Sequence, residues 1–432
     1  MTMLEIQGGK PLCGELTAAG NKNAVLPMIA ASLLTDEPVQ LENAPAIGDV
    51  LTMLRLAEAL GVRASHDTAS ATLTLHAADI RADVMPPALC RTVRAGILFA
   101  APMLHRLGRV TMSPPGGDVI GRRRLDTHFL GLEALGAEIL AGEVFLFRAP
   151  RGLKGADIFL PEASVTGTAQ VLMAAVLAKG TTIIRNAAAE PHIEDLCVLL
   201  REMGAQIDGL GTNTLTVHGV ERLHGTRHRV SSDYTEVGSF LALAAATGGA
   251  ITVRNVDPTH YRLITRVFER LGVELEFNGD AVSVPALQEL RVRADIGGGI
   301  PVIDTGIWPQ FPSDLLSVMI VLATQAKGTV LFFEKLYESR LYFVDRLIVM
   351  GANGVICDPH RVVISGPSKL HGIEMNSPDI RAGIALVGAA LCAQGRSVIR
   401  NIRFVDRGYE RIEDKLRALG ADVQRVPDTN PG

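Results

Sequence analysis

The sequence predicts an α/β protein in which one structural unit is repeated six times along the chain. A tripeptide of the form Leu/Met-Gly-Val/Ala recurs at intervals of 68–79 residues, and each copy separates a helix-like stretch from a strand-like one. The six glycines are Gly61, Gly136, Gly204, Gly272, Gly351 and Gly420. A period of about 70 residues exceeds that of the common helical solenoids, so each unit is long enough to bury a small core.

Each unit is expected to contain two helices and two strands. A glycine directly after an apolar run suits a helix C-terminus, because it adopts the left-handed region without the steric cost of a Cβ atom. The six glycines therefore mark the ends of the second helices. Upstream of each lies an alanine-rich first helix and then a β-branched strand, such as residues 180–184. The predicted order is helix, strand, loop, helix, strand.

Length and composition agree with a globular enzyme of two or three domains. The 432 residues are 47% apolar but only 4% aromatic, so Ala, Val, Leu and Ile must build the core. A net charge of −4 argues against a nucleic-acid partner held by bulk electrostatics. The longest apolar runs, residues 95–104 and 384–392, are shorter than the roughly 18 residues that a membrane span requires. We expect neither partner.

Cysteine and histidine usage predicts a cytoplasmic protein without a metal site. The five cysteines are scattered, odd in number and without a CxxC pair, which suits a reducing compartment. The chain opens on a strand-like run, where a secreted protein would carry a signal peptide. None of the 11 histidines belongs to an HExxH motif.

Positive side chains recur at equivalent places in the units, at the starts of first helices and in the loops after paired strands. They are Lys22, Arg94, Arg123, Arg340, Arg381 and Arg407. If the units pack around a pseudo-symmetry axis, helix N-termini with unbonded amides would point the same way and attract an anion. The expected ligand carries several negative charges, such as phosphates and a carboxylate. The alternative is that these are ordinary solvated charges.

Several motifs resemble those of the UDP-N-acetylglucosamine enolpyruvyl transferase family, and the resemblance covers residues 1–426. The sister family that makes enolpyruvylshikimate phosphate normally has a Ser-Lys-Ser type start, where this chain has Asn-Lys-Asn at residues 21–23. The matching segments are GNKNAVLP at 20–27, TVRA at 92–95, PGGDVIG at 115–121, SVTGT at 164–168, FPSD at 311–314, ESR at 338–340, DIRA at 379–382 and DRGYERIEDK at 406–415.

The resemblance implies a two-domain inside-out α/β barrel built from six helix-strand-helix-strand repeats, three per domain. The first lobe would span residues 22–231 and carry a lid loop at about 114–126. The second lobe would combine 1–21 with 232–426, and 427–432 would form a tail. The family places its active site between the two lobes and closes the lid to exclude water.

The reaction that the resemblance implies is transfer of the enolpyruvyl group from phosphoenolpyruvate to a sugar 3'-hydroxyl, with release of phosphate and without a cofactor. Asp314 would take the hydroxyl proton, although its place at a helix start also suits an N-cap. The phosphate would bind Lys22, Arg123 and Arg407, the carboxylate would bind Arg340 and Arg381, and Arg94 would lie nearby. The acceptor would contact Asn23, Asp126, His128, Ser164, Val165, Thr166 and Asp314.

Asp118 departs from the pattern, because many members of the family carry a cysteine there that the antibiotic fosfomycin alkylates. A carboxylate cannot form that thioether, so we expect an enzyme insensitive to fosfomycin. Asp118 would donate the proton in catalysis. Because the neighbouring Arg122, Arg123 and Arg124 would lower its pKa, it should become a competent acid only after an anion binds. The alternative is a simple turn residue.

Three further departures concern the acceptor. Arg124 stands where the family usually has proline, Tyr234 replaces a common arginine, and Trp308 lies close to the expected base. Trp308 would stack on an acceptor ring or belong to the core. An enolpyruvyl transferase with another acceptor, for example uridine monophosphate, therefore stays open beside the UDP-N-acetylglucosamine enzyme. A non-catalytic binding paralogue is the third hypothesis.

Overall fold

The structure is a computed structural model that describes residues 2–118 and 120–428. The chain divides into two compact units. Unit 1 comprises Met1–Ala19, Asp118–Arg122 and Ser232–Gly432, and unit 2 comprises Gly20–Gly117 and Arg123–Ser231. Each unit has its own hydrophobic core, drawn from residues 4–18 and 234–423 in unit 1 and from 24–230 in unit 2. None of the described helices is long and apolar enough to cross a bilayer.

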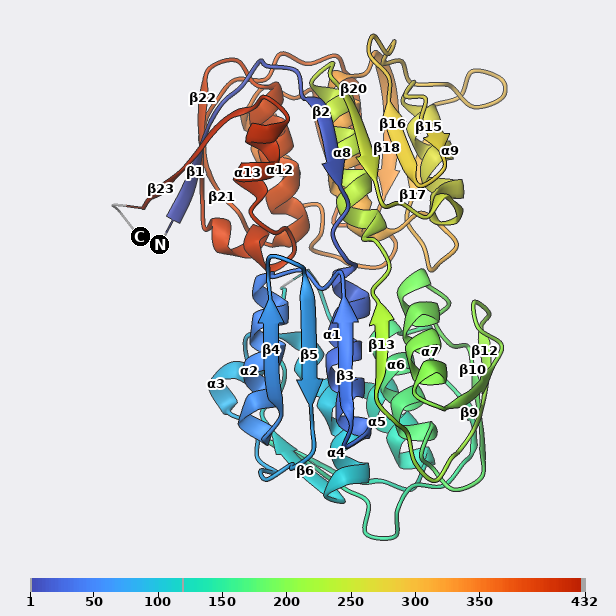
Figure 1. Ribbon diagram of the computed structural model, residues 1–432. Coiled ribbons are helices and arrows are strands. Elements are labelled where there is room, and N and C mark those ends of the chain that lie inside the picture. The colour runs from blue at the N-terminus through green and yellow to red at the C-terminus, as the bar shows by residue number, and fades with distance from the viewer. Residues whose placement is uncertain (1, 119, 429–432) are drawn as a thin grey trace. The chain divides into compact units, whose positions relative to one another are not determined.

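Unit 2 contains three β-sheets within its described residues, and Figure 1 shows β4, β5, β3 and β13 of the first one side by side. In order across each sheet, the strands are β13 (Thr226–Arg229), β3 (Pro38–Glu42), β5 (Thr72–His76) and β4 (Arg63–Asp67); β6 (Arg109–Met112), β8 (Phe145–Arg148) and β7 (Glu138–Ala141); and β11 (Gln206–Asp208), β12 (Thr214–His218), β10 (Thr181–Arg185) and β9 (Asp157–Phe159).

Unit 1 also contains three sheets within its described residues, and one of them joins both ends of the chain, because β1 pairs antiparallel with β22 and with β23. Across each sheet the strands are β21 (Glu374–Asn376), β22 (Arg396–Arg400), β1 (Thr2–Gln7) and β23 (Asp422–Pro427); β15 (Glu276–Asn278), β16 (Ala281–Val284), β14 (Ala250–Arg254) and β2 (Cys13–Thr17); and β17 (Val302–Asp304), β18 (Gly328–Phe333), β20 (Arg361–Gly366) and β19 (Gly354–Asp358).

The helices come in pairs, as predicted, and the six glycines follow the second helix of each pair. Their φ angles lie between +81° and +110°, the left-handed region that favours glycine. The second helices are α2 (Gly48–Leu60), α5 (Asp126–Ala134), α7 (Pro191–Glu202), α9 (Arg262–Arg270), α11 (Val344–Val349) and α13 (Ile412–Ala418). The prediction of six helix ends is confirmed.

The first helices lie largely in the cores, which explains their alanine content. Every residue of α8 is buried, and a Cβ atom on Gly388 of α12 would lie 3.0 Å from the Leu243 side chain of α8. Small residues therefore let these helices approach closely. The first helices are α1 (Lys22–Ala31), α4 (Ala100–Arg106), α6 (Val165–Ala175), α8 (Tyr234–Ala246), α10 (Ser313–Gln325) and α12 (Ile380–Cys392), and α4 continues a 3₁₀ turn, η2 (Arg94–Phe99). The remaining short helices are η1 (Ser32–Leu34), α3 (Pro87–Cys90), η3 (Pro258–Tyr261) and η4 (Ile402–Arg407).

Each sheet contains more than the two strands expected per unit. The strand after the first helix pairs antiparallel with an additional strand, as β3 pairs with β5 and β10 with β12. In five of the six sheets that the described residues form, the strand after the first helix also pairs in parallel with a strand that precedes a first helix, as β10 does with β9. Two of the strands that precede a first helix pair with a strand of one unit, although the helix that follows them belongs to the other unit. β2 leads into α1 but pairs with β14, and β13 leads into α8 but pairs with β3.

Two predicted boundaries differ from the structure. The tail predicted at 427–432 begins too early, because Pro427 ends β23 and the buried Asp428 forms an ion pair with Arg400. Residues 429–432 lie outside the described residues. The lid loop at 114–126 was assigned to the first lobe, but its residues 118–122 belong to unit 1. Hydrogen bonds to residues 338 and 339, which follow β18, hold them there.

Candidate active site

The predicted site residues fall into one group in each unit. Unit 1 holds Asp118, Asp314, Arg340, Arg381 and Arg407. Unit 2 holds Lys22, Asn23, Arg94, Arg123, Asp126, His128, Ser164, Val165 and Thr166. The first group gathers side chains from five separate segments of the chain, which supports treating it as a site.

The carboxylate of Asp314 lies between two buried arginines. Arg340 Nη2 donates to one carboxylate oxygen at 3.0 Å, and Arg381 Nη2 lies 2.9 Å from the other. Asp314 is the second residue of α10, whose N-cap position is occupied by Pro312 without a side-chain cap. The N-cap alternative for Asp314 is therefore wrong. Its carboxylate remains about one-third exposed, so it can reach a ligand while the two guanidinium groups orient it.

Acidic neighbours keep the two arginines charged. Burial alone would lower the pKa of Arg340, but Asp314, Asp379 and Glu334 outweigh it and raise that pKa. The pKa of Arg381 is raised as well, against the effect of burial, chiefly by Asp314. Burial raises the pKa of Asp379 above its usual value, while Arg340 opposes that rise. Both arginines therefore carry full charge at any physiological pH.

Glu334 is a buried carboxylate that the sequence analysis missed. It accepts hydrogen bonds from Thr305 and Ser313, at 3.0 and 2.6 Å, and from the backbone N–H groups of Leu336 and Tyr337. Ser313 directly precedes Asp314, and residues 336–337 lead to Arg340. Glu334 thus fixes the start of α10 and the loop after β18 relative to each other. A carboxyl group this well bonded can remain buried.

Asp118 forms an ion pair with Arg407, 289 residues away in sequence. Both side chains are mostly buried, with 16% and 17% exposure. The loop around Asp118 is held by Arg122, whose N–H donates to Glu338, and by Ile120, whose carbonyl accepts from Ser339. Residue 119 of the predicted lid lies outside the described residues.

The sequence predicts Arg122, Arg123 and Arg124 near Asp118 but does not indicate the cation that bonds to it. The cation bonded to Asp118 is Arg407, whereas Arg124 pairs with Asp126. The predicted excess of positive charge also changes. In unit 1 the carboxylates of Asp118, Asp314, Glu334 and Asp379 accompany the three predicted arginines, so an incoming anion must compete with carboxylates.

In unit 2, Lys22 lies at the start of α1 and bonds to a partner that the sequence analysis missed. Its Nζ lies 2.7 Å from Asp49 in the first turn of α2, and both side chains are about 90% or more buried. The half-buried Asn23 follows, and its backbone N–H donates to the side chain of Asn21, the N-cap of α1. The start of α1 therefore holds Lys22 and Asn23, the two residues there that are predicted to contact ligands.

Arg94 holds the last part of the predicted lid loop. Its Nη2 donates to the carbonyl oxygens of Arg123 and Arg124, at 3.1 and 2.7 Å. Arg123 is thereby brought beside Arg94 and stays half-buried. Arg124, one of the departures, pairs with Asp126 at 2.6 Å, and both side chains are more than half exposed. Asp126, a predicted acceptor contact, is therefore paired with Arg124, which stands where the family usually has proline.

His128 is completely buried and so does not present its own surface to an acceptor. Its Nε2 lies 3.0 Å from the hydroxyl oxygen of Thr166 near the start of α6. Burial, together with the charge of Arg94, lowers the pKa of His128 to about 3, so the ring is neutral at physiological pH. Ser164, the N-cap of α6, and Val165 are half-buried beside Thr166 in sequence. The ring of His128 can thus orient the Thr166 hydroxyl.

The prediction of unbonded amides at the helix starts is wrong for four helices. Side chains of the chain itself accept from the first amides of α1, α6, α8 and α12. The N-cap residues are Asn21, Ser164, Asp233 and Asp379. Anion binding at these ends must therefore rely on side-chain cations.

Trp308 and Tyr234, two of the departures, pack against each other in unit 1. Their ring centroids are 5.7 Å apart at an interplanar angle of 41°, and Tyr234 also meets His260 edge-on at 6.1 Å. Tyr234 is buried, whereas Trp308 is only half-buried. One face of the indole therefore packs on protein, and stacking of Trp308 on an acceptor ring stays a prediction.

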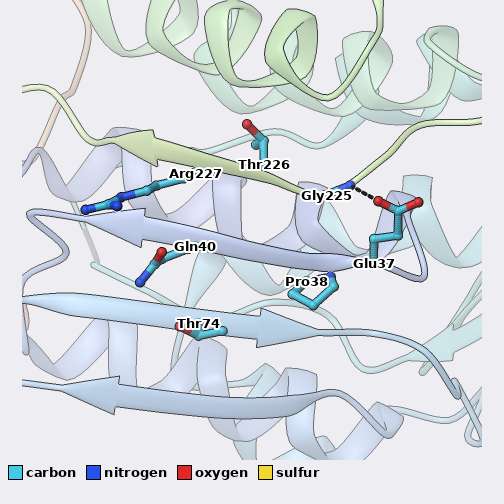
Figure 2. A pocket seen from close by; sticks show the side chains of 7 residues that line it. All are labelled: Glu37, Pro38, Gln40, Thr74, Gly225, Thr226 and Arg227. Carbon is cyan, nitrogen blue, oxygen red and sulfur yellow. Dashed lines mark hydrogen bonds between the residues drawn. The ribbon is translucent and has the colours of Figure 1, made fainter.

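A shallow hollow on the outer side of the β13-β3-β5-β4 sheet does not belong to this site. Figure 2 shows its lining, in which the backbone N–H of Gly225 donates to Glu37 at 2.9 Å and Gln40, Thr74 and Thr226 project from the strands. None of the predicted site residues lines it. Within residues 2–118 and 120–428, no group of three or more His, Cys, Asp or Glu side chains could hold a metal ion.

Comparisons with known proteins agree in their result. A family model described as EPSP synthase (3-phosphoshikimate 1-carboxyvinyltransferase) matches residues 6–416. A UDP-N-acetylglucosamine 1-carboxyvinyltransferase from Bradyrhizobium diazoefficiens is 51% identical over 423 residues, which are 98% of each chain. A protein of the same name from Treponema denticola is 51% identical over 97% of this chain and 98% of its own.

Solved structures of similar fold cover nearly the whole chain. The enolpyruvyl transferase NikO from Streptomyces tendae matches with a TM-score of 0.87 and 23% identity, over 98% of this chain and 99% of its own. An EPSP synthase from Acinetobacter baumannii matches with a TM-score of 0.75 and 18% identity, over 99% and 100%. At these identities the likeness concerns the fold.

Proposed function

The chain belongs to the enolpyruvyl transferase family, and we propose that it transfers the enolpyruvyl group of phosphoenolpyruvate to the 3'-hydroxyl of UDP-N-acetylglucosamine, releasing phosphate. This is the first committed step of peptidoglycan precursor synthesis. The observation that carries the proposal is the 51% identity, across 98% of both chains, to a relative named for this activity. Five free cysteines suit a cytoplasmic location.

Asp314 acts as the base in this proposal. Its carboxylate is oriented by Arg340 and Arg381 and is partly exposed, so it can accept the proton of the 3'-hydroxyl. The acceptor oxygen then forms a bond to C2 of phosphoenolpyruvate while C3 gains a proton from Asp118. In the second step C3 loses a proton, the double bond returns and phosphate leaves.

The cations hold the anionic groups of phosphoenolpyruvate. Arg340 and Arg381 take its carboxylate, which joins Asp314 as an acceptor for their planar guanidinium groups. Lys22, Arg123 and Arg407 take the phosphate, with Arg94 as support. Asn23, Asp126, Ser164, Val165 and Thr166 contact the acceptor, and His128 orients Thr166.

Asp118 becomes an acid when phosphate binds Arg407. In the free protein the carboxylate of Asp118 is bonded to the Arg407 guanidinium. A phosphate that binds Arg407 would take the place of that carboxylate and release Asp118 to face the ligand. The loop around Asp118 would act as the lid that excludes water.

The six sheets with their helix pairs are, in this proposal, six copies of one repeat, three per lobe, in an inside-out α/β barrel. The equal strand order of the five four-stranded sheets and the recurring glycines support it. The functional lobes are those predicted at residues 22–231 and at 1–21 with 232–426.

A second candidate is transfer to a different nucleotide acceptor. The observation that favours it is the Arg124–Asp126 ion pair, since it engages a carboxylate expected to contact the acceptor. Phosphate release from phosphoenolpyruvate should be measured with UDP-N-acetylglucosamine, uridine monophosphate and shikimate 3-phosphate. We expect phosphate release with UDP-N-acetylglucosamine alone. Faster release with uridine monophosphate supports the second candidate, and no release with any acceptor contradicts both.

A further inference from the structure

Arg381 is held at four points by its own unit. Its backbone N–H donates to Asp379 at 2.8 Å, and its carbonyl accepts from Ser317 at 2.8 Å. In the side chain, Nη2 faces Asp314, whereas Nη1 donates to the hydroxyl oxygen of Tyr409 at 3.0 Å. The rotation of the guanidinium plane therefore depends on Asp314 and Tyr409, which are its two described side-chain partners for hydrogen bonding.

The hydroxyl proton of Tyr409 has a defined direction. Ser239 on α8 donates its only hydroxyl proton to the carbonyl of Thr235 at 2.7 Å, so toward Tyr409 it can act only as an acceptor. The two hydroxyl oxygens lie 2.9 Å apart. Tyr409 therefore donates to Ser239 and turns a lone pair toward Arg381. Tyr409 and Ser239 are both 1% exposed or less, so water does not compete for these bonds.

The acceptor that Tyr409 offers is neutral. Burial raises the pKa of Tyr409 above its usual value, although Arg381 opposes that rise, so the phenol keeps its proton. A carboxylate in the same place would neutralise Arg381, whereas a phenol oxygen fixes the guanidinium and leaves its charge for a ligand. The guanidinium carbon also lies 5.6 Å from the centre of the Tyr409 ring, within the range of a cation–π contact.

We propose that Tyr409 is a positioning residue, which sets the orientation in which Arg381 meets the carboxylate of phosphoenolpyruvate. The chain Thr235, Ser239, Tyr409, Arg381 links α8 to the base at the start of α10. The inference rests on the proposed function, because it takes Arg381 as the group that binds that carboxylate.

The test is Tyr409→Phe, which keeps the ring and removes the hydroxyl group. Without that acceptor the guanidinium can rotate, so we expect the Kd and the KM for phosphoenolpyruvate to rise on the order of tenfold, the effect of one hydrogen bond to a charged group. We expect kcat to change less than threefold (about 0.6 kcal/mol). A structural role alone would lower the melting temperature without separating KM from kcat.

Tyr261→Phe is the matched control. Tyr261 is also buried in unit 1, and its hydroxyl has no hydrogen-bond partner among the described residues. This variant should keep the wild-type Kd for phosphoenolpyruvate. Equal Kd values for wild type and Tyr409→Phe, or equal shifts in the two variants, overturn the inference.

A second variant covers the case in which Tyr409→Phe does not fold. Ser239→Ala leaves the phenol in place but removes the acceptor that orients its proton, so a smaller rise in Kd is expected, and an unchanged Kd counts against the inference. Binding of phosphoenolpyruvate is measured by calorimetry, without an acceptor. The result therefore does not depend on whether the proposed acceptor is correct, which the phosphate-release panel decides separately.

Discussion

Replacing Asp118 by asparagine should make phosphoenolpyruvate bind more tightly and react more slowly. Asp118 occupies Arg407 in the free protein, and Arg407 is also a proposed phosphate ligand. Phosphoenolpyruvate must therefore break the Asp118–Arg407 ion pair before its phosphate can take that guanidinium. The asparagine side chain has the same shape but no charge, so it competes less well.

The size of the effect follows from the burial of the pair. Both side chains are about five-sixths buried, so solvent screens the pair only weakly. A hydrogen bond to a charged group contributes about 1.5–3 kcal/mol, and a neutral one about 0.5–1.5 kcal/mol. The difference of about 1–1.5 kcal/mol corresponds to a Kd for phosphoenolpyruvate roughly five- to tenfold lower. Loss of the acid should reduce turnover about 100-fold or more.

Calorimetric titration with phosphoenolpyruvate and a phosphate-release assay measure the two effects separately. Asp428→Asn is the matched control, because Asp428 forms a similarly buried ion pair with Arg400 in the same unit but is no part of the site. The control should bind phosphoenolpyruvate as the wild type does. An Asp118→Asn variant that binds with unchanged or weaker affinity would refute competition for Arg407. Unchanged turnover would reduce Asp118 to a turn residue.

Three further predictions concern the base, the loop and a buried histidine. Asp314→Asn should lower turnover at least about 100-fold and destabilise the fold by about 3 kcal/mol, because two buried guanidinium groups lose their shared carboxylate; turnover near the wild-type rate would contradict its role as base. Fosfomycin should leave the wild type unmodified in a mass spectrum and should alkylate Asp118→Cys; an unmodified variant counts against the loop assignment. His228 lies between Asp195 and Glu202. Burial alone would lower the pKa of His228, but the two carboxylates outweigh it and raise that pKa. The protonated ring therefore stabilises the fold fully below a pH of about 6.5, and this stabilisation is lost as the pH rises through the folded-state pKa. Urea unfolding should show this loss in the wild type but not in His228→Gln, and identical pH profiles would exclude it.

Local signals in the sequence predicted the elements that depend on neighbouring residues. The six helix ends could be predicted because a left-handed residue after a helix needs glycine, whatever the helix packs against. Pairing between distant strands has no such signal. β13 lies beside β3, with Arg229 opposite Glu42, although these two residues are 187 positions apart in sequence. Nothing local in Thr226–Arg229 indicates its partner.

The same difference between local and long-range signals explains which features of the site could be predicted from the sequence. Asp314, Arg340 and Arg381 were predicted from short motifs, and the structure brings them together. The partner of Lys22 was missed because Asp49 lies in a first helical turn, where an acidic residue is ordinary. The partner of Asp118 was missed because Arg407 lies 289 residues away in sequence. The direction of the Tyr409 hydroxyl requires Ser239, which no motif contains.

The most direct test of the proposed activity is the mass of the nucleotide product after wild-type protein is incubated with phosphoenolpyruvate and UDP-N-acetylglucosamine. We expect UDP-N-acetylglucosamine to gain one enolpyruvyl group for each phosphate released, and Asp314→Asn to form no detectable product in the same time. Phosphate release without a heavier nucleotide, or equal product from the variant, would contradict this expectation.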